Sequence, residues 1–296
     1  MNRTVAVLGP GAVGGALAVR LLTAGIHTIC VARPETAGII ALAGLVVETR
    51  GATLAARPEV AERLTKPVGL LLVTVKAPAL EEALDRIDPS AVEEGVVLPL
   101  LNGLEHMHLL RSCFAGRVAA GSVSHFQAYR AGRVQIVEGT SSPIVTMASE
   151  ELPSRDLERV AELLRQARVE VRIAPSEKRV LWHKAVRISV LAAATAATGR
   201  TVGELRSDVV WRPRLEQAIG ETCMIAEADG VQLRLPAQMT IIDDMADETT
   251  TSAARDVASG RRSELDAIVG SVLRAGERLG VPCPTLSELA AMAGLG

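Results

Sequence analysis

The 296-residue chain has few aromatic residues, no excess of positive charge and no closely spaced cysteines. Aromatic side chains make up 2% of the sequence, and the net charge is −2. A nucleic-acid surface needs a basic field and aromatic stacking faces, so this composition argues against nucleic acid as a partner. The four cysteines lack a CxxC spacing. They indicate reduced thiols in a cytoplasmic protein rather than a disulfide framework.

The sequence also lacks an apolar run long enough to span a membrane. Its start, MNRTVAVLGPGAVGGALAV, resembles a signal peptide only in having one arginine before an apolar run. The glycines in this stretch have a spacing that a ligand-binding turn explains. We therefore predict no membrane partner. The stretch EHMH at residues 105–108 contains metal-ligating residue types, but no second cluster accompanies it, and no metal is predicted.

A glycine-rich turn follows the first strand pattern of the chain. The strand ends in GPGAVGG, which places Gly9, Gly11 and Gly14 in a GxGxxG spacing directly before a helical pattern. Such a turn lets the backbone, including Ala12 and Val13, approach a pyrophosphate at a helix N-terminus. The strand–turn–helix context predicts a dinucleotide-binding site. The alternative is a glycine-rich turn without a ligand.

The end of the second strand pattern bears on the choice of dinucleotide. A carboxylate at this position usually bonds the ribose hydroxyls of NAD, whereas Arg33 stands here. The guanidinium fork suits the 2′-phosphate of NADPH. Glu35, two residues later, is the competing residue that would favour NAD. We predict NADPH.

Strand and helix patterns then alternate to residue 174. Continuous apolar strands separated by helices predict a parallel sheet that is covered on both faces. Ligands bind at the carboxyl ends of such strands, where Lys76 and Asn102 stand. The fold class is therefore α/β, with an N-terminal, Rossmann-type, mostly parallel sheet in an NADP-binding domain over residues 1–174. The strand patterns cover residues 4–8, 27–32, 69–78, 95–103, 132–139, 142–148 and 169–174, and the helical patterns cover residues 16–25, 79–87, 104–113 and 154–167.

Beyond residue 174 the strand patterns stop. We predict an all-helical C-terminal domain over residues 175–296 that carries the substrate and the catalytic groups. Its apolar helices could form a homodimer interface or pack only on one another. The main helical patterns cover residues 177–199, 209–230, 239–260 and 263–280.

Lys184 occupies an unexpected place in the first of these helices. It lies on one apolar stripe with Leu181, Ile188 and Leu191. A lysine there either extends its stem along the stripe to water or serves chemistry in a cleft. The helix alone favours the first interpretation.

Taken in order, the motifs resemble those of the ketopantoate reductase (2-dehydropantoate 2-reductase) family over nearly the whole chain. They are GxGAVGG after the first strand, an arginine after the second, VKA, LNG, a Trp-x-Lys helix, GEL, TSAARD…RRSELD and GVPCPT. The resemblance implies NADPH-dependent reduction of a small 2-oxo acid to a 2-hydroxy acid, with ketopantoate, an intermediate of pantothenate biosynthesis, as the first candidate substrate. It places the substrate between the two domains.

The resemblance also assigns roles to individual residues. Lys184 matches the general acid, and Glu264 matches a carboxylate that contacts the substrate and helps to orient the chemistry. The negative charge of Glu264 near Lys184 is expected to keep the amine protonated. Ser252 matches the serine that holds the substrate carboxylate. Lys76 and Asn102 match residues that line the cleft and contact both cofactor and substrate.

The sequence departs from the family where substrate contacts are expected. Ile188, Ala192 and Val202 stand where the family commonly has asparagine, and Arg187 appears beside them. The resemblance therefore implies the reaction and leaves the 2-oxo acid open, including an acid other than ketopantoate. A non-catalytic NADPH-binding sensor is the alternative from another class. The roles of Arg187 and of His125, in GSVSHFQ, stay open.

Overall fold

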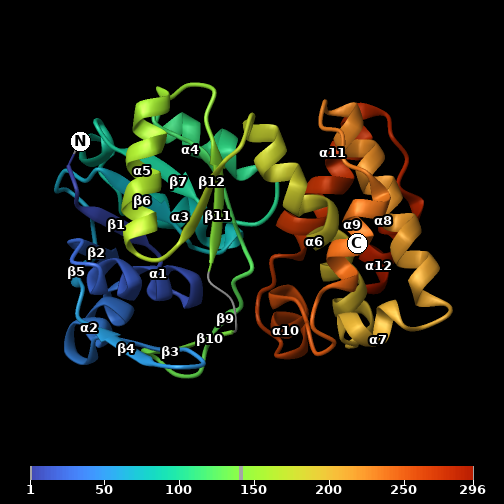
Figure 1. Ribbon diagram of the computed structural model, residues 1–296, viewed down its shortest axis with the longest axis horizontal. Coiled ribbons are helices and arrows are strands. Elements are labelled where there is room, and N and C mark those ends of the chain that lie inside the picture. The colour runs from blue at the N-terminus through green and yellow to red at the C-terminus, as the bar shows by residue number, and fades with distance from the viewer. Residues whose placement is uncertain (1, 140–142, 296) are drawn as a thin grey trace. The chain divides into compact units, whose positions relative to one another are not determined.

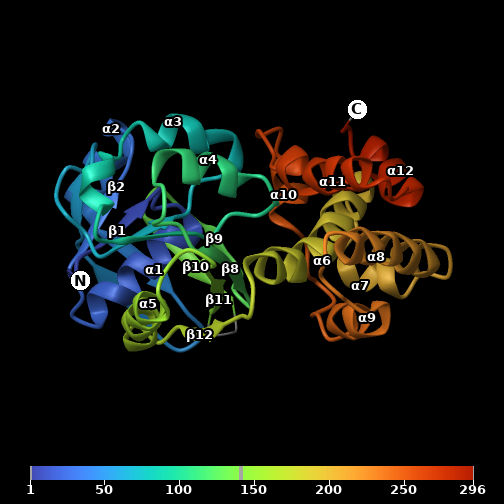
Figure 2. The same cartoon turned by 90° about the horizontal axis from the view of Figure 1, so that it is seen from above.

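The computed structural model describes residues 2–139 and 143–295. These residues form two compact units, of which unit 1 holds the strands and unit 2 is helical (Figures 1 and 2). Unit 1 runs to Leu101 and resumes over His106–Val180, and unit 2 consists of Asn102–Glu105 and the chain from Leu181 onward.

The main sheet of unit 1 is parallel, as the sequence predicts. Its order is β5-β2-β1-β6-β7, and four of its strands are buried along their whole length. Burial on both faces explains why their sequences are continuously apolar. Successive strands are added on opposite sides of β1, so the ligand-binding edge lies at the carboxyl end of that strand. The strands are β1 (Val5–Leu8), β2 (Thr28–Val31), β5 (Glu59–Ala61), β6 (Leu70–Val73) and β7 (Val96–Pro99).

Helices cover this sheet and connect it to the rest of unit 1. Helix α1 packs against β1 and β2 and also contacts β3, β4, β9 and β10, while α5 packs against β12 and α1 (Figure 1). The buried face of α1 is built from small and branched apolar residues, which let it approach several strands closely. The helices are α1 (Ala12–Thr23), α2 (Pro34–Ala43), α3 (Leu80–Leu84), α4 (His106–Cys113) and α5 (Ser154–Gln166).

Two smaller sheets accompany the main one, and the sequence patterns do not separate them from it. One has the order β4-β3-β10-β9 and the other β12-β11-β8. Strand β10 pairs in parallel with β3, far earlier in the chain, so only the folded structure defines this sheet. Of the strand predicted over residues 142–148, residue 142 lies outside the described residues. The strands are β3 (Leu45–Glu48), β4 (Thr53–Ala56), β8 (Ala120–Ser124), β9 (Ala128–Arg130), β10 (Gln135–Glu138), β11 (Ile144–Ala148) and β12 (Glu170–Ile173).

Unit 2 is built from helices around a core of Ala, Val, Leu and Ile side chains, as predicted. In the part of the chain that the structure describes, no helix combines the length and apolarity that crossing a membrane requires. The helices are α6 (Glu177–Thr198), α7 (Val202–Arg206), α8 (Trp211–Ala228), α9 (Leu235–Asp243), α10 (Ser252–Ala258), the π-helical turn Asp266–Gly270, α11 (Ser271–Leu279) and α12 (Pro284–Met292).

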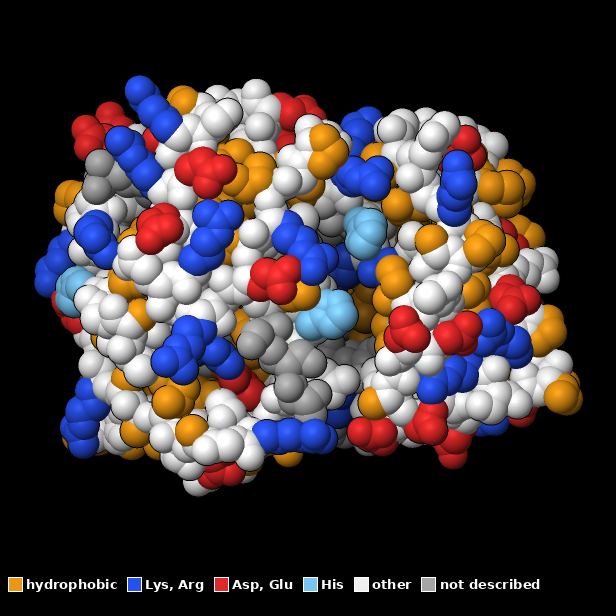
Figure 3. Space-filling model, in the orientation of Figure 1, with side chains coloured by type: hydrophobic (Ala, Val, Ile, Leu, Met, Phe, Trp, Pro, Cys, Tyr) orange, Lys and Arg blue, Asp and Glu red, His pale blue; other side chains and the backbone are white. Residues whose placement is uncertain are grey.

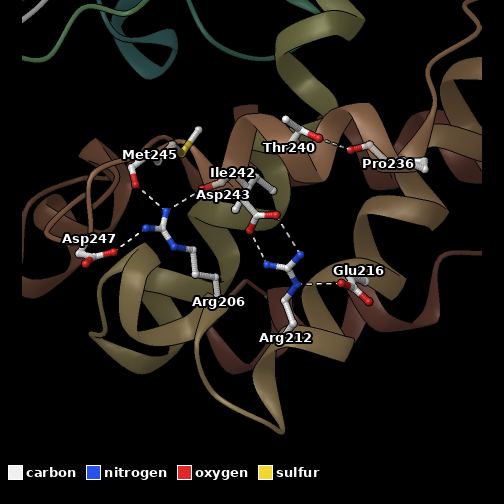
Figure 4. Close-up of polar contacts among 9 residues, drawn as sticks. All are labelled: Arg206, Arg212, Glu216, Pro236, Thr240, Ile242, Asp243, Met245 and Asp247. Atoms are coloured by element: carbon white, nitrogen blue, oxygen red, sulfur yellow. Dashed lines mark hydrogen bonds and ion pairs between the residues drawn. The ribbon is translucent and has the colours of Figure 1, made fainter.

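The single helix predicted over residues 239–260 is wrong, because two helices, α9 and α10, occupy this stretch. The segment between them packs against α7. Arg206 of that helix donates hydrogen bonds to the carbonyl oxygens of Ile242 and Met245 at 2.8 and 2.5 Å, and it forms an ion pair with Asp247 (Figure 4). Satisfied carbonyl groups at the end of α9 favour termination there.

The division between the units comes slightly later than the predicted boundary at residue 174. The first turn of α6 belongs to unit 1. Its Glu177 side chain is buried and accepts hydrogen bonds from the Arg111 guanidinium and, at 3.2 Å, from the backbone N–H of Glu150. These polar contacts are invisible to a helix pattern, which indicates only where the helix begins.

Candidate active site

The predicted site residues fall into two sets, one in each unit. In unit 1 the set begins with the glycine turn after β1. Gly9 has φ +84°, and a Cβ there would lie 2.4 Å from the Val75 side chain. A Cβ on Gly14 would lie 2.1 Å from Oγ1 of Thr74. That hydroxyl donates to the carbonyl oxygen of Gly9 at 2.8 Å and holds the turn in place, a role that the sequence did not reveal.

The middle of the turn has a different environment, and it fits a pyrophosphate. A Cβ on Gly11 would meet nothing closer than a carbonyl oxygen at 3.9 Å. Helix α1 begins directly afterwards, without a side-chain cap and without an acidic residue in its first turn. The N–H groups of Ala12 and Val13 are therefore at the positive end of the helix dipole, where phosphate oxygens bind.

Arg33 and Lys76 follow strands that adjoin β1. Leu8 at the end of β1 pairs with Val31 of β2 and with Val73 of β6, all in parallel. Residues that follow these strands therefore lie at one edge of the sheet. Arg33 is the exposed N-cap residue of α2, and Lys76 is exposed before a short 3₁₀ turn.

In unit 2, Lys184 lies on α6 and is partly buried, and Glu264 is 7% exposed. Burial lowers the pKa of Lys184 to about 8, the positive charge of Arg187 lowers it too, and the negative charge of Glu264 raises it. With a pKa near 8 the amine is mostly protonated at pH 7. A partly buried ammonium close to a buried carboxylate can hold and release a proton near neutral pH.

The sequence pattern predicts that Glu264 lies within a helix. In the structure it lies in a bend just before one. Its carbonyl oxygen accepts a hydrogen bond from the N–H of Ile268 at 2.9 Å, and the π-helical turn follows. Such turns insert an extra residue per turn and redirect side chains. The turn therefore fixes the backbone from which the Glu264 carboxylate projects.

Arg187 is another charged residue in this part of unit 2. Its side chain lies one helical turn after Lys184, and the residue is 9% exposed. Its guanidinium donates a hydrogen bond to Oε1 of Gln238 on α9, a residue that sequence reasoning missed. Burial lowers the pKa of Arg187 to about 10, and the nearby Cys223 raises it.

Asn102 belongs to unit 2, although it follows β7 in the chain. Its neighbour Gly103 has φ +92°, and a Cβ there would lie 2.1 Å from the carbonyl oxygen of Ala267. Glu105 forms an ion pair with Arg274 at 2.8 Å. The Asn102–Glu105 segment therefore packs on the π-helical turn that follows Glu264.

Ser252 is the first residue of α10 and is exposed. The neighbouring Thr251 caps this helix and also hydrogen-bonds to Thr195 of α6 at 2.9 Å, which ties α10 to α6. Within residues 143–295, no hydrogen bond joins Ser252 to Lys184 or Glu264. The serine is thus on a helix that is held by α6, the helix that carries Lys184.

Ile188, Ala192 and Val202 stand where the family resemblance calls for asparagine, and their surroundings are apolar. Ala192 and Val202 have no exposed surface and belong to the core of unit 2, and Ile188 packs against it. His125 follows β8, is exposed and has φ +52°. No interaction among the described residues gives it a role in the site.

Groups of at least three metal-ligating side chains are absent from the described residues. Acidic and basic side chains are interspersed over the face shown in Figure 3, as a net charge of −2 suggests. The four cysteines are free.

Comparison with known proteins identifies relatives over almost the whole chain. Residues 5–148 match the family model described as ketopantoate reductase PanE/ApbA, and residues 178–295 match the model of its C-terminal domain. A 2-dehydropantoate 2-reductase of Caulobacter vibrioides is 28% identical over 301 residues, which cover 98% of this chain and 97% of the relative.

Two solved structures show the same likeness. The crystal structure of a PanE/ApbA family ketopantoate reductase from Ralstonia eutropha has a TM-score of 0.88 at 26% identity and covers 99% of this chain and 97% of its own. A ternary structure of D-mandelate dehydrogenase with NADH and anilino(oxo)acetate has a TM-score of 0.90 at 19% identity, with coverage of 98% and 97%. At that identity the second likeness concerns the fold alone.

Proposed function

The chain belongs to the ketopantoate reductase family, and from this membership we propose that it reduces a 2-oxo acid to a 2-hydroxy acid with NADPH. Oxidoreductase chemistry on a 2-oxo acid is the part that the family supports directly. Ketopantoate, which yields pantoate for pantothenate biosynthesis, is the first candidate substrate. The observation that carries the proposal is Lys184, a partly buried ammonium influenced by the buried Glu264 carboxylate.

The residues of unit 2 handle the proton and the substrate. A bound NADPH supplies the hydride. Protonated Lys184 donates a proton to the oxygen of the carbonyl as negative charge develops there. Glu264 favours the protonated amine through its charge. Ser252 and Asn102 contribute a hydroxyl and an amide for the carboxylate and other polar groups of the acid.

The residues of unit 1 hold the nucleotide. Gly11 leaves room for the pyrophosphate, and the N–H groups of Ala12 and Val13 donate to its oxygens. Arg33 and Lys76 stand at the same sheet edge and supply positive charge. These features support a dinucleotide, and the exposed guanidinium of Arg33 favours the phosphorylated form.

The test is NADPH oxidation, followed by absorbance, with a panel of 2-oxo acids that begins with ketopantoate. Lys184→Ala should lower turnover by roughly 10²–10⁴, the usual contribution of a positioned acid, with little effect on NADPH binding. Lys178, exposed on the first turn of α6, is the matched control, and Lys178→Ala should keep normal turnover. Normal turnover in Lys184→Ala would exclude the acid role. Silence of the parent protein across the panel, with tight NADPH binding, would instead favour a sensor.

A 2-oxo acid other than ketopantoate is the second candidate substrate. Ala192 and Val202 are fully buried among apolar side chains where the family resemblance calls for asparagine. A buried substrate hydroxyl that finds no hydrogen-bond partner lowers the binding free energy by roughly 1–3 kcal/mol. An acid with an apolar side chain and a higher kcat/KM than ketopantoate in the same panel would establish this alternative.

A further inference from the structure

Unit 1 contains a cavity at the start of α2 that involves more than the predicted cofactor residues. Its volume is about 320 Å³. One wall comes from the first two turns of α2, which follow Arg33, and the other from the turn between β9 and β10. The lining residues are Glu35, Thr36, Ile39, Arg130, Gly132 and Arg133.

Strand pairing holds the two walls together. Strand β10 pairs in parallel with β3, the strand that follows α2, through Ile136 and Val47. A Cβ on Gly15 of α1 would lie only 2.5 Å from Cδ1 of Ile136, so the Ile136 side chain packs closely against α1. The β9–β10 turn is therefore fixed relative to both α2 and the helix of the glycine turn. In a Rossmann-type sheet the adenosine ribose lies at the end of β2, where α2 starts.

The charges around this cavity favour an anion. Arg133 forms an ion pair with Glu35 at 3.5 Å, and the Arg130 guanidinium donates to the carbonyl oxygen of Arg133. Among the residues that the structure describes, the Arg33 guanidinium has no hydrogen bond or ion pair. Two guanidinium groups, those of Arg130 and Arg133, thus line the cavity with one carboxylate that is already paired, and Arg33 directly precedes the helix that forms one wall.

The Arg133–Glu35 pair contributes little to folding. The two side chains are 75% and 80% exposed, and exposed pairs have a median contribution near zero. Glu35 is also the one acidic residue in the first turn of α2. An unpaired carboxylate there would repel a 2′-phosphate and would accept hydrogen bonds from the ribose hydroxyls of NADH.

We propose that Arg133 is a cofactor-specificity residue that acts through Glu35. By pairing with this carboxylate it removes the acceptor and the negative charge that would favour NADH. Arg33 and Arg130 then receive the 2′-phosphate of NADPH at the mouth of the cavity. The inference rests on the proposed dinucleotide site and adds the β9–β10 turn to it.

The experiment compares the binding of 2′,5′-ADP and 5′-AMP to the full chain by isothermal titration calorimetry. These probes carry the adenosine end with and without the 2′-phosphate and need no 2-oxo acid. Arg133→Ala should lower the affinity for 2′,5′-ADP about tenfold and keep the melting temperature. Its affinity for 5′-AMP should be at least that of the parent, because the freed Glu35 carboxylate can accept hydrogen bonds from the ribose hydroxyls. Arg50→Ala is the matched control, because Arg50 is exposed in the turn between β3 and β4 and does not line the cavity.

The double variant Glu35→Gln/Arg133→Ala separates masking of the carboxylate from direct contact with the phosphate. Masking predicts that the double variant recovers affinity for 2′,5′-ADP to within about threefold of the parent. A double variant as weak as Arg133→Ala would overturn the inference, as would equal losses for both probes in Arg133→Ala. Failure of the parent to bind either probe would overturn the dinucleotide site itself. If the parent protein prefers 2′,5′-ADP but turns over none of the 2-oxo acids in the panel, only the proposed reductase activity is refuted.

Discussion

Lys184 illustrates how the surroundings of one side chain set its chemistry. Burial and the Arg187 charge lower the pKa of its amine, and Glu264 opposes them. On a helical wheel, Lys184 looks like one of many lysines that reach past an apolar stripe to water. The family motifs single it out together with Glu264, and the folded unit adds the charge of Arg187, one turn further along the same helix.

The pH dependence of turnover follows from the same charges. A general acid must be protonated, so we expect kcat to fall as the pH rises through about 8, the pKa of Lys184. Removing the positive charge in Arg187→Met should raise that pKa, because a neighbouring cation disfavours the ammonium form. The falling limb should move to higher pH and kcat should persist further into the alkaline range.

Arg187→Lys is the control for this prediction, since it keeps a charge at a similar position. Its pH profile should stay close to that of the parent. The measurement is kcat against pH for the parent and both variants, with circular dichroism to confirm folding. An unshifted limb in a folded Arg187→Met protein would show that Arg187 does not tune the acid.

At the scale of elements, the strand–turn–helix unit from β1 to α1 is the part that sequence predicts best. Its glycine spacing is a local pattern, and the close contacts of Gly9 with Val75 and of Gly14 with Thr74 show why two of the three positions need glycine. The helix predicted over residues 239–260 fails for the opposite reason. Its interruption depends on Arg206 and on the packing of the intervening segment against α7, which lie outside the helical pattern.

The glycine turn yields a prediction that separates folding from binding. Gly14→Ala would place a Cβ 2.1 Å from Oγ1 of Thr74, so it should lower both the melting temperature and the affinity for NADPH. Gly11→Ala would place its Cβ in open space and should leave the melting temperature nearly unchanged. Gly11→Ala should still lower the affinity for NADPH, because the methyl group occupies the space for the pyrophosphate. Calorimetry and thermal unfolding measure the two effects, and equal behaviour of the variants would contradict this account.

At the scale of the whole molecule, the two units each bury cysteines that report on their folding. Burial raises the pKa of Cys30 in unit 1 to about 12 and that of Cys223 in unit 2 to about 11. Cys283 in unit 2 is also buried, and burial raises its pKa. Cys113 is only partly buried. The thiolate is the reactive form, so the three buried thiols should react slowly in the folded protein.

We therefore expect a thiol reagent at neutral pH to modify Cys113 first, with the other three thiols following only as their units unfold. Mass spectrometry of peptides after brief labelling at increasing urea concentration measures this order. Simultaneous labelling of Cys30 and Cys223 would mean that the units unfold together. Rapid labelling of either one without denaturant would contradict their burial.

The sequence by itself determined the local elements and the family. Short-range patterns were sufficient for the parallel strands, the glycine turn, the helical second half and the motifs that carry the family resemblance. Tertiary structure decided which charged groups influence one another. Arg133 pairs with Glu35, 98 residues away, and Arg111 pairs with Glu177, 66 residues away. Such contacts depend on strand pairing and helix packing, and a pattern confined to neighbouring residues does not contain them.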